Sequence, residues 1–171
     1  MDLKLTGRRA LVTGGSRGIG RGIVAALAAE GAQVVFCGRS AGAGEHTAAE
    51  LRAVGMDVTF LQGDMVSDAG IDLLAETVLG SGPIDILVNN VGGAHDAAAG
   101  ARPFTDIPAT DWPLTFAKCV FNAVRLCNTM VPTMQKRGWG RVINISSSAG
   151  MEPGMAPADY SAAKAALNTA T

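Results

Sequence analysis

A glycine-rich stretch between two apolar segments places the strongest constraint on how this chain folds. Residues 11–20 read LVTGGSRGIG, and residues 21–28 carry apolar side chains at helical spacing. This order is typical of a strand, a tight turn and a helix. Such a turn points backbone N–H groups and the positive end of a helix dipole at one spot, which suits a phosphate group. A Cβ would block both the turn and the approach of the phosphate.

The turn alone predicts either a dinucleotide site or only a tight loop, because Gly14, Gly18 and Gly20 are spaced more widely than the usual G-x-G-x-x-G fingerprint. The rest of the chain favours the dinucleotide site, since strand-like segments alternate with helical ones throughout. Strands are expected over residues 9–13, 32–37, 57–61, 84–90 and 141–146.

This alternation predicts an α/β fold with right-handed crossovers. We expect one NAD(P)-binding domain over residues 1–171, a Rossmann-type doubly wound parallel sheet in three αβα layers with strand order 3-2-1-4-5. Its ligand crevice should open where the strand order reverses. Ser67 is expected to cap a helix over 71–79, and Pro132 to kink or end a long helix over about 111–136. The glycine- and alanine-rich loop before it, up to Pro108, is expected to be functional or mobile.

Composition excludes several classes of protein. A hydrophobic content of 48% fits a buried parallel sheet, and no apolar run is long enough to predict a membrane span. A net charge of −1 without a basic cluster argues against a nucleic-acid partner. The N-terminus lacks a signal peptide's apolar segment, and three cysteines without metal-ligand spacing indicate a reduced, cytoplasmic protein. With only His46 and His95, no metal site is expected.

Tyr160 and Lys164 are four residues apart on an expected helix and therefore share one face. An ammonium near a phenol lowers the pKa of the phenol, which suits it to proton transfer. The same pair is also compatible with a plain helix surface. Ser146, Ser147 and Ser148 follow the fifth strand and predict either a hydrogen-bond donor to a substrate or a turn; the residues alone do not choose among them.

Two arginines bear on the choice of cofactor. Arg39 follows the second strand, where the adenosine ribose would lie, and Arg17 in the glycine turn reaches the same region. NAD-binding folds usually carry an acid at this strand end, and this chain has none there. NADP is therefore favoured over NAD, although Arg39 is also compatible with a solvated surface residue.

Together these motifs resemble the classical short-chain dehydrogenase/reductase family. Residues 13–20 match its T-G-x-x-x-G-x-G motif, residues 89–92 its N-N-A-G motif with Val91 for alanine, and residues 160–164 its Y-x-x-x-K. Within the serine cluster, Ser147 has the family's spacing to Tyr160. The resemblance implies that Tyr160 is the general acid/base, Lys164 its pKa-lowering and ribose-holding partner, and Ser147 the group that polarises the carbonyl.

The resemblance also implies a set of cofactor contacts. Asn89 would be structural, tying neighbouring strands together. The cofactor would contact Gly14, Ser16, Arg17, Gly18, Ile19, Gly20, Arg39, Asp64, Met65, Asn90, Val91, Gly92, Tyr160 and Lys164. Asp64 and Met65 would contact the adenine, and Asn90 to Gly92 would border the adenosine ribose.

Two departures from the family pattern stand out. The family's catalytic asparagine would fall at position 119, which is Cys119, with Asn122 one helical turn further on. We expect slower proton exchange rather than loss of hydride transfer, with either residue as a substitute. Family members also continue well past the equivalent of Thr171, so we expect the sequence to be part of a longer chain, truncated on its C-terminal side.

The resulting prediction is an NADP-dependent oxidoreductase that interconverts a small-molecule ketone and a secondary alcohol, with a 3-oxoacyl thioester as one candidate substrate. The alternatives are a non-catalytic dinucleotide sensor or scaffold, supported only by Cys119, and a chain that only associates with other subunits. By resemblance we expect a homodimer or homotetramer.

Overall fold

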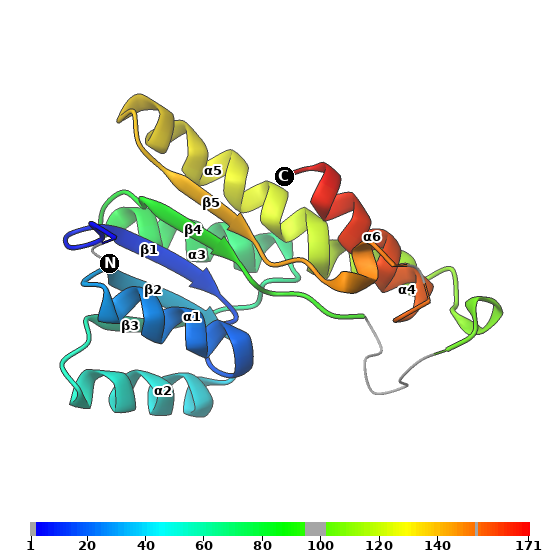
Figure 1. Ribbon diagram of the computed structural model, residues 1–171, viewed down its shortest axis with the longest axis horizontal. Coiled ribbons are helices and arrows are strands. Elements are labelled where there is room, and N and C mark those ends of the chain that lie inside the picture. The colour runs from blue at the N-terminus through cyan, green and yellow to red at the C-terminus, as the bar shows by residue number, and fades with distance from the viewer. Residues whose placement is uncertain (1–2, 95–101, 153) are drawn as a thin grey trace.

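The computed structural model describes residues 3–94, 102–152 and 154–171, and its strands form one parallel five-stranded sheet (Figure 1). The order is β3-β2-β1-β4-β5, which confirms the predicted topology. The strands are β1 (Arg9–Thr13), β2 (Gln33–Gly38), β3 (Val58–Gln62), β4 (Ile86–Asn89) and β5 (Arg141–Asn144). The chain leaves β1 toward β2 and β3 on one side and returns to β4 and β5 on the other, so the order reverses between β1 and β4.

Helices cover both faces of this sheet (Figure 1). They are α1 (Gly18–Ala29), α2 (Ala41–Ala53), α3 (Asp68–Gly80), α4 (Asp111–Phe116), the π-helical turn η3 (Ala117–Phe121), α5 (Asn122–Lys136) and α6 (Ala158–Thr169). Short 3₁₀ turns of the described segments, η2 (Phe104–Asp106) and η4 (Ser148–Gly150), lie in the connections.

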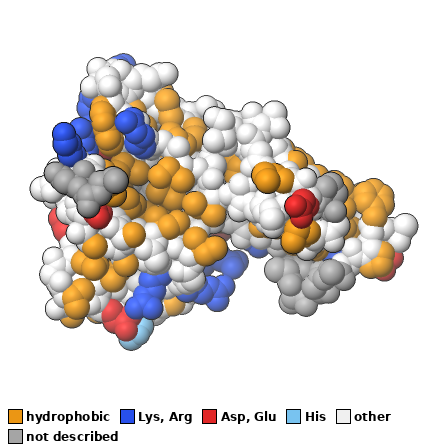
Figure 2. Space-filling view, viewed as in Figure 1, with side chains coloured by type: hydrophobic (Ala, Val, Ile, Leu, Met, Phe, Trp, Pro, Cys, Tyr) orange, Lys and Arg blue, Asp and Glu red, His pale blue; other side chains and the backbone are white. Residues whose placement is uncertain are grey.

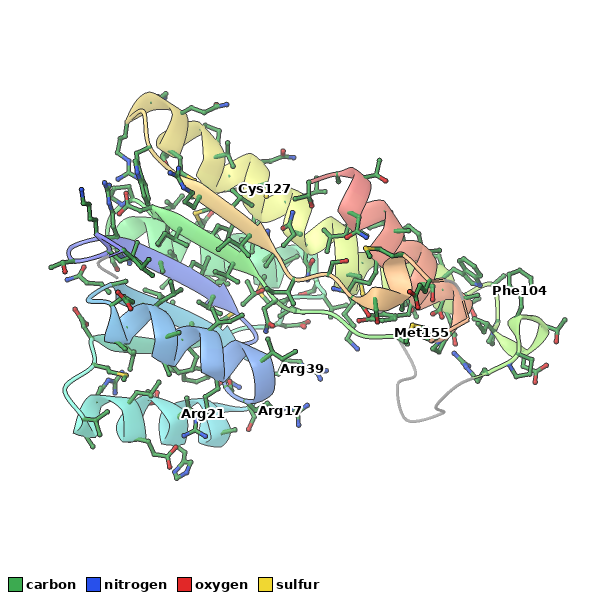
Figure 3. The ribbon with its side chains drawn as sticks, viewed as in Figure 1. Arg17, Arg21, Arg39, Phe104, Cys127 and Met155 are labelled. Atoms are coloured by element: carbon green, nitrogen blue, oxygen red, sulfur yellow. The ribbon has the colours of Figure 1, made fainter. Side chains whose placement is uncertain are left out.

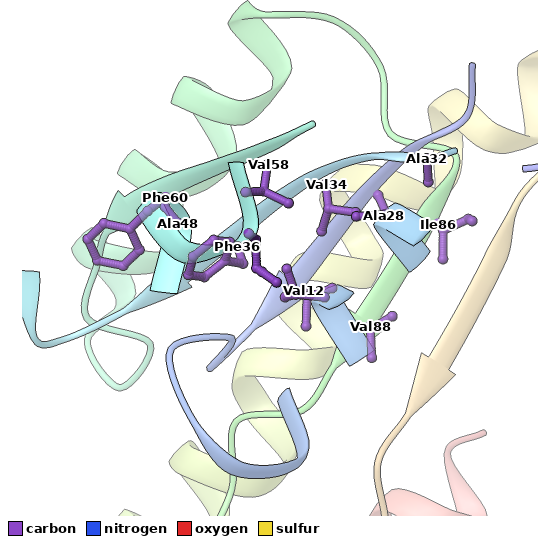
Figure 4. Packing of buried hydrophobic residues seen from close by; sticks show 13 residues of the cluster. Val12, Ala28, Ala32, Val34, Phe36, Ala48, Val58, Phe60, Ile86 and Val88 are labelled. Carbon is purple, nitrogen blue, oxygen red and sulfur yellow. The ribbon is translucent and has the colours of Figure 1, made fainter. Parts of the chain in front are cut away.

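Each strand supplies side chains to both faces because side chains alternate along a strand. Val12 of β1 belongs to the cluster of Figure 4, which also includes Phe36 of β2, Ala28 of α1 and Ala48 of α2. Its neighbour Leu11 points the other way, into a second cluster with Leu126 of α5. Burial of β1, β2 and β4 on both faces contributes to the high hydrophobic content, whereas the edge strand β5 is largely exposed.

The expected cap at Ser67 is confirmed, since its Oγ accepts a hydrogen bond from the Gly70 N–H at 3.2 Å. The early helix end at Pro132 is wrong, because α5 continues to Lys136. Pro132 and Asn128, whose carbonyl loses its helical donor, are both exposed, so water can satisfy that carbonyl.

The long helical segment instead changes register at η3. Within the described residues, no helix is both long and apolar enough to cross a membrane. The expected loop up to Pro108 lies partly outside the described residues, as does His95.

Candidate active site

A cavity of about 520 Å³ opens at the carboxyl ends of β1, β2, β3 and β4. It lies at the predicted reversal of strand order. Its lining residues are Gly14, Ser16, Arg17, Gly18, Ile19, Gly20, Gly38, Arg39, Ser40, Ala43, Gly63, Met65, Val66, Asn90, Val91, Gly92 and Lys118. We call this cavity the crevice.

Bare backbone shapes the floor of the crevice. Gly14 adopts a φ of 70°, a conformation that favours glycine. A Cβ on Gly20 would lie 2.2 Å from the Gly14 carbonyl oxygen, so the helix start packs directly on the turn. The Ser16 hydroxyl is buried without a hydrogen-bond partner among the described residues. An unpaired hydroxyl in a glycine cradle at a helix N-terminus fits the diphosphate of a dinucleotide.

Hydrogen bonds between the end of β1 and the residues that follow β4 hold this cradle in place. Thr13 Oγ1 accepts from the backbone N–H groups of Asn90 and Val91 at 2.9 and 3.1 Å. The Asn90 side-chain amide donates to the carbonyl oxygens of Thr13 and Gly14 at 2.9 and 3.2 Å. Asn89 donates to Asn144 Oδ1 at 2.8 Å, which confirms that it ties β4 to β5.

Positive charge lies along the rim of the crevice. Arg17 and Arg39 are exposed and adjacent in Figure 3, in a region where Figure 2 shows several Lys and Arg side chains together. Within the described part of the chain, no carboxylate pairs with either guanidinium. Arg21, by contrast, pairs with Glu50 at 2.9 Å.

The two residues expected at the adenine behave differently. Met65 is buried and lines the crevice. Asp64 is not among the lining residues, although its neighbours Gly63 and Met65 are. Its carboxylate accepts the Val66 N–H at 3.1 Å in the turn after β3. The adenine contact at Asp64 stays a prediction.

Tyr160 and Lys164 lie on one face of α6, with Lys164 Nζ 5.9 Å from the centroid of the tyrosine ring. Lys164 is 2% exposed and donates to the Ile145 carbonyl oxygen at 2.6 Å, which anchors α6 to the end of β5. Burial lowers the pKa of Lys164, while the nearby Cys119 opposes this effect.

Gly92 joins this pair to the crevice. A Cβ on Gly92 would lie 3.0 Å from Lys164 Nζ and 3.7 Å from Cys119 Sγ, so the ammonium lies directly behind a residue that lines the cavity. Tyr160, Lys164 and Ser147 themselves do not line the cavity. Lys164 reaches the cavity wall at Gly92, and Tyr160 lies beside Lys164.

The three serines after β5 are not equivalent. Ser147 Oγ accepts the Ala149 N–H at 3.2 Å and so begins η4. The Ser146 hydroxyl is buried without a partner among the described residues, whereas Ser148 is exposed. Ser147 therefore also forms the turn that the serine cluster predicted.

Cys119 occupies η3 and is 1% exposed. Its Sγ accepts the Gly93 N–H at 3.4 Å and lies 3.5 Å from the Gly93 carbonyl oxygen. Burial raises the pKa of the Cys119 thiol. Asn122 donates to the Lys118 carbonyl oxygen at 2.8 Å, and no hydrogen bond joins it to Lys164 among the described residues.

Several lining residues were not predicted from the sequence. Gly38 is the last residue of β2, and Ser40 and Gly63 lie just after β2 and β3, positions that could have indicated them. No sequence pattern indicated that Lys118 lines the crevice, because the direction of its side chain depends on the π-helical turn. The others are Ala43 and Val66.

A family model described as short chain dehydrogenase matches residues 8–171. The chain belongs to the short chain dehydrogenase family. It is 35% identical over 161 residues to D-beta-hydroxybutyrate dehydrogenase of Cupriavidus necator, covering 94% of this chain and 60% of that protein. It is 37% identical over 159 residues to acetoacetyl-CoA reductase of Rhizobium meliloti, covering 92% and 62%.

Among solved short chain dehydrogenase folds, L-sorbose reductase from Gluconobacter frateurii, complexed with NADPH and L-sorbose, superposes with a TM-score of 0.91 at 32% identity. The match covers 99% of this chain and 63% of that one. The chain thus spans less than two thirds of the length of these relatives.

Proposed function

We propose that this chain forms the cofactor-binding and catalytic part of an NADP-dependent oxidoreductase that interconverts a ketone and a secondary alcohol. The observation that carries the proposal is that the proposed cofactor site and the proposed proton-transfer pair both reach Gly92. The glycine cradle lies on one side of it, and the Tyr160–Lys164 pair of α6 on the other. A protein that only bound the dinucleotide would need the glycine cradle but not the Tyr160–Lys164 pair.

Each residue has a chemical role in this proposal. The bound dinucleotide supplies or accepts the hydride. Tyr160 donates its phenolic proton to the carbonyl oxygen in the reductive direction, and Lys164 stabilises the phenolate that remains. Ser147 hydrogen-bonds the same oxygen where negative charge develops. The test is NADPH consumption with 3-oxoacyl thioesters, ketoses and ketosteroids; the proposal fails if none of these carbonyl compounds is reduced.

A 3-oxoacyl thioester is the substrate class we propose, supported by the similarity to acetoacetyl-CoA reductase. We also propose a cytoplasmic homodimer or homotetramer. Apolar side chains exposed on α4, η3 and α5 support self-association: Leu114, Phe121 and Val124 are 40%, 57% and 41% exposed. Light scattering on the protein measures the oligomeric state.

Arg39 should set the preference for NADPH over NADH. Arg39→Asp replaces a cation at the proposed 2′-phosphate position with an anion, so we expect Kd for NADPH to rise about 10- to 100-fold while Kd for NADH changes little. Fluorescence titration with each cofactor measures this. Arg21→Asp is the control, because Arg21 pairs with Glu50 and does not line the crevice. An unchanged preference would remove Arg39 from the phosphate site.

Cys119→Asn should leave turnover equal or higher. An amide near Lys164 offers the proton path a stronger hydrogen-bonding group than a thiol. Turnover and proton exchange with solvent are compared with those of Cys119→Ala, and thermal unfolding verifies folding. A collapse of activity in folded Cys119→Asn would show that the thiol has a chemical role of its own.

A further inference from the structure

Lys118 adds a third cation to the crevice. The described lining residues include Arg17, Arg39 and Lys118 but no aspartate or glutamate. Such a one-sided set of charges attracts an anion, and the low-dielectric walls strengthen the attraction.

The geometry of η3 directs Lys118 toward the crevice. Lys118 Nζ donates to the Ala94 carbonyl oxygen at 3.2 Å and would lie 3.8 Å from a Cβ on Gly93. The next residue, Cys119, contacts Gly93 with its thiol. Two successive side chains thus lie against the segment that follows β4. π-Helical turns inside α-helices are frequent at functional sites.

Lys118 and Arg39 flank the glycine turn on opposite sides. The turn follows β1, which lies between β2 and β4 in the sheet. Arg39 follows β2, and Lys118 lies against the residues that follow β4. A diphosphate over the turn would therefore have Arg39 toward its adenosine end and Lys118 toward the Lys164 end.

We propose that Lys118 binds the diphosphate of the dinucleotide, on the side nearer Lys164. This inference rests on the proposed function. An ammonium has three N–H donors, and only one is directed at Ala94. No carboxylate of the described residues pairs with Lys118. A compact point charge suits a phosphate oxygen.

The test is cofactor affinity in Lys118→Met and Lys118→Gln. Because NADPH and NADH share the diphosphate, Kd for both should rise about tenfold, unlike the selective effect of Arg39→Asp. The dependence of Kd on salt should become shallower. Lys118→Gln keeps a neutral donor for Ala94, and Lys118→Arg, which keeps the charge, should restore most of the affinity. Lys136→Met, exposed at the end of α5, is the matched control.

Unchanged affinity in folded Lys118→Gln would overturn the assignment. An effect on NADPH alone would also overturn it, because the charge would then act on the 2′-phosphate. If the wild-type chain binds neither cofactor, the proposed function fails as well. Binding by the wild type with no change in the Lys118 variants refutes only the role of Lys118.

Discussion

Tyr160→Phe is expected to lower carbonyl reduction about 10²- to 10⁴-fold, the usual contribution of a positioned general acid, while the protein still binds NADPH. The substitution removes only the hydroxyl and keeps the ring beside Lys164. Proton transfer slows because the substitution removes the proposed general acid. Steady-state reduction and NADPH fluorescence titration measure the two effects separately.

The comparison is informative because Tyr160 does not line the crevice. For Tyr160→Phe we expect a Kd for NADPH within about twofold of the wild-type value, a much smaller change than tenfold. Turnover equal to the wild type would refute the role of the phenol. A loss of NADPH binding together with activity would show that the hydroxyl is also needed to hold the cofactor, the contact that the family resemblance implies.

Gly20→Ala is expected to abolish tight NADPH binding, with Kd raised about 100-fold or more, equivalent to at least 2.8 kcal/mol. The added Cβ would meet the Gly14 carbonyl oxygen at 2.2 Å and the Asn90 amide at 2.5 Å, so the turn must open. Overpacking of this kind also costs about 1–3 kcal/mol of stability. Fluorescence titration and urea unfolding measure both effects.

Gly22→Ala is the matched control two residues along the same helix. A Cβ there meets nothing within 4 Å, and Gly22 is exposed. Alanine should stabilise α1 by about 0.5–1 kcal/mol and leave NADPH affinity unchanged. Wild-type affinity in Gly20→Ala, or equal losses in both variants, would contradict the account of the glycine cradle.

The topology was predictable because it follows from alternation and handedness, which short-range patterns reveal. The β1 residues 9–13 and the cap at Ser67 are examples. The continuation of the long helix past Pro132 and its π-helical turn were not predictable from such patterns. Pro132 carries a strong local signal, but exposure at the surface removed its expected cost. The π-helical turn at Ala117–Phe121 has no Pro or Gly to mark it.

The residues of the candidate site also fall into those that local sequence patterns predict and those that depend on the three-dimensional fold. Backbone requirements gave Gly14 and Gly20, and helical spacing placed Tyr160 beside Lys164. The hydrogen bond from the Val66 N–H to the Asp64 carboxylate was not predicted, because it depends on the conformation of the turn after β3. Lys118 depends on helix register and on a contact to a segment distant in sequence, so no local pattern could predict it.

The measurement that tests the central claim most directly is a crystal structure of the protein with NADPH. We expect the diphosphate on the turn between Gly14 and Gly20, the 2′-phosphate at Arg39, and the nicotinamide ring facing the Tyr160 hydroxyl beside Lys164. A nicotinamide ring directed away from Tyr160, or a cofactor bound outside the crevice, would contradict the account.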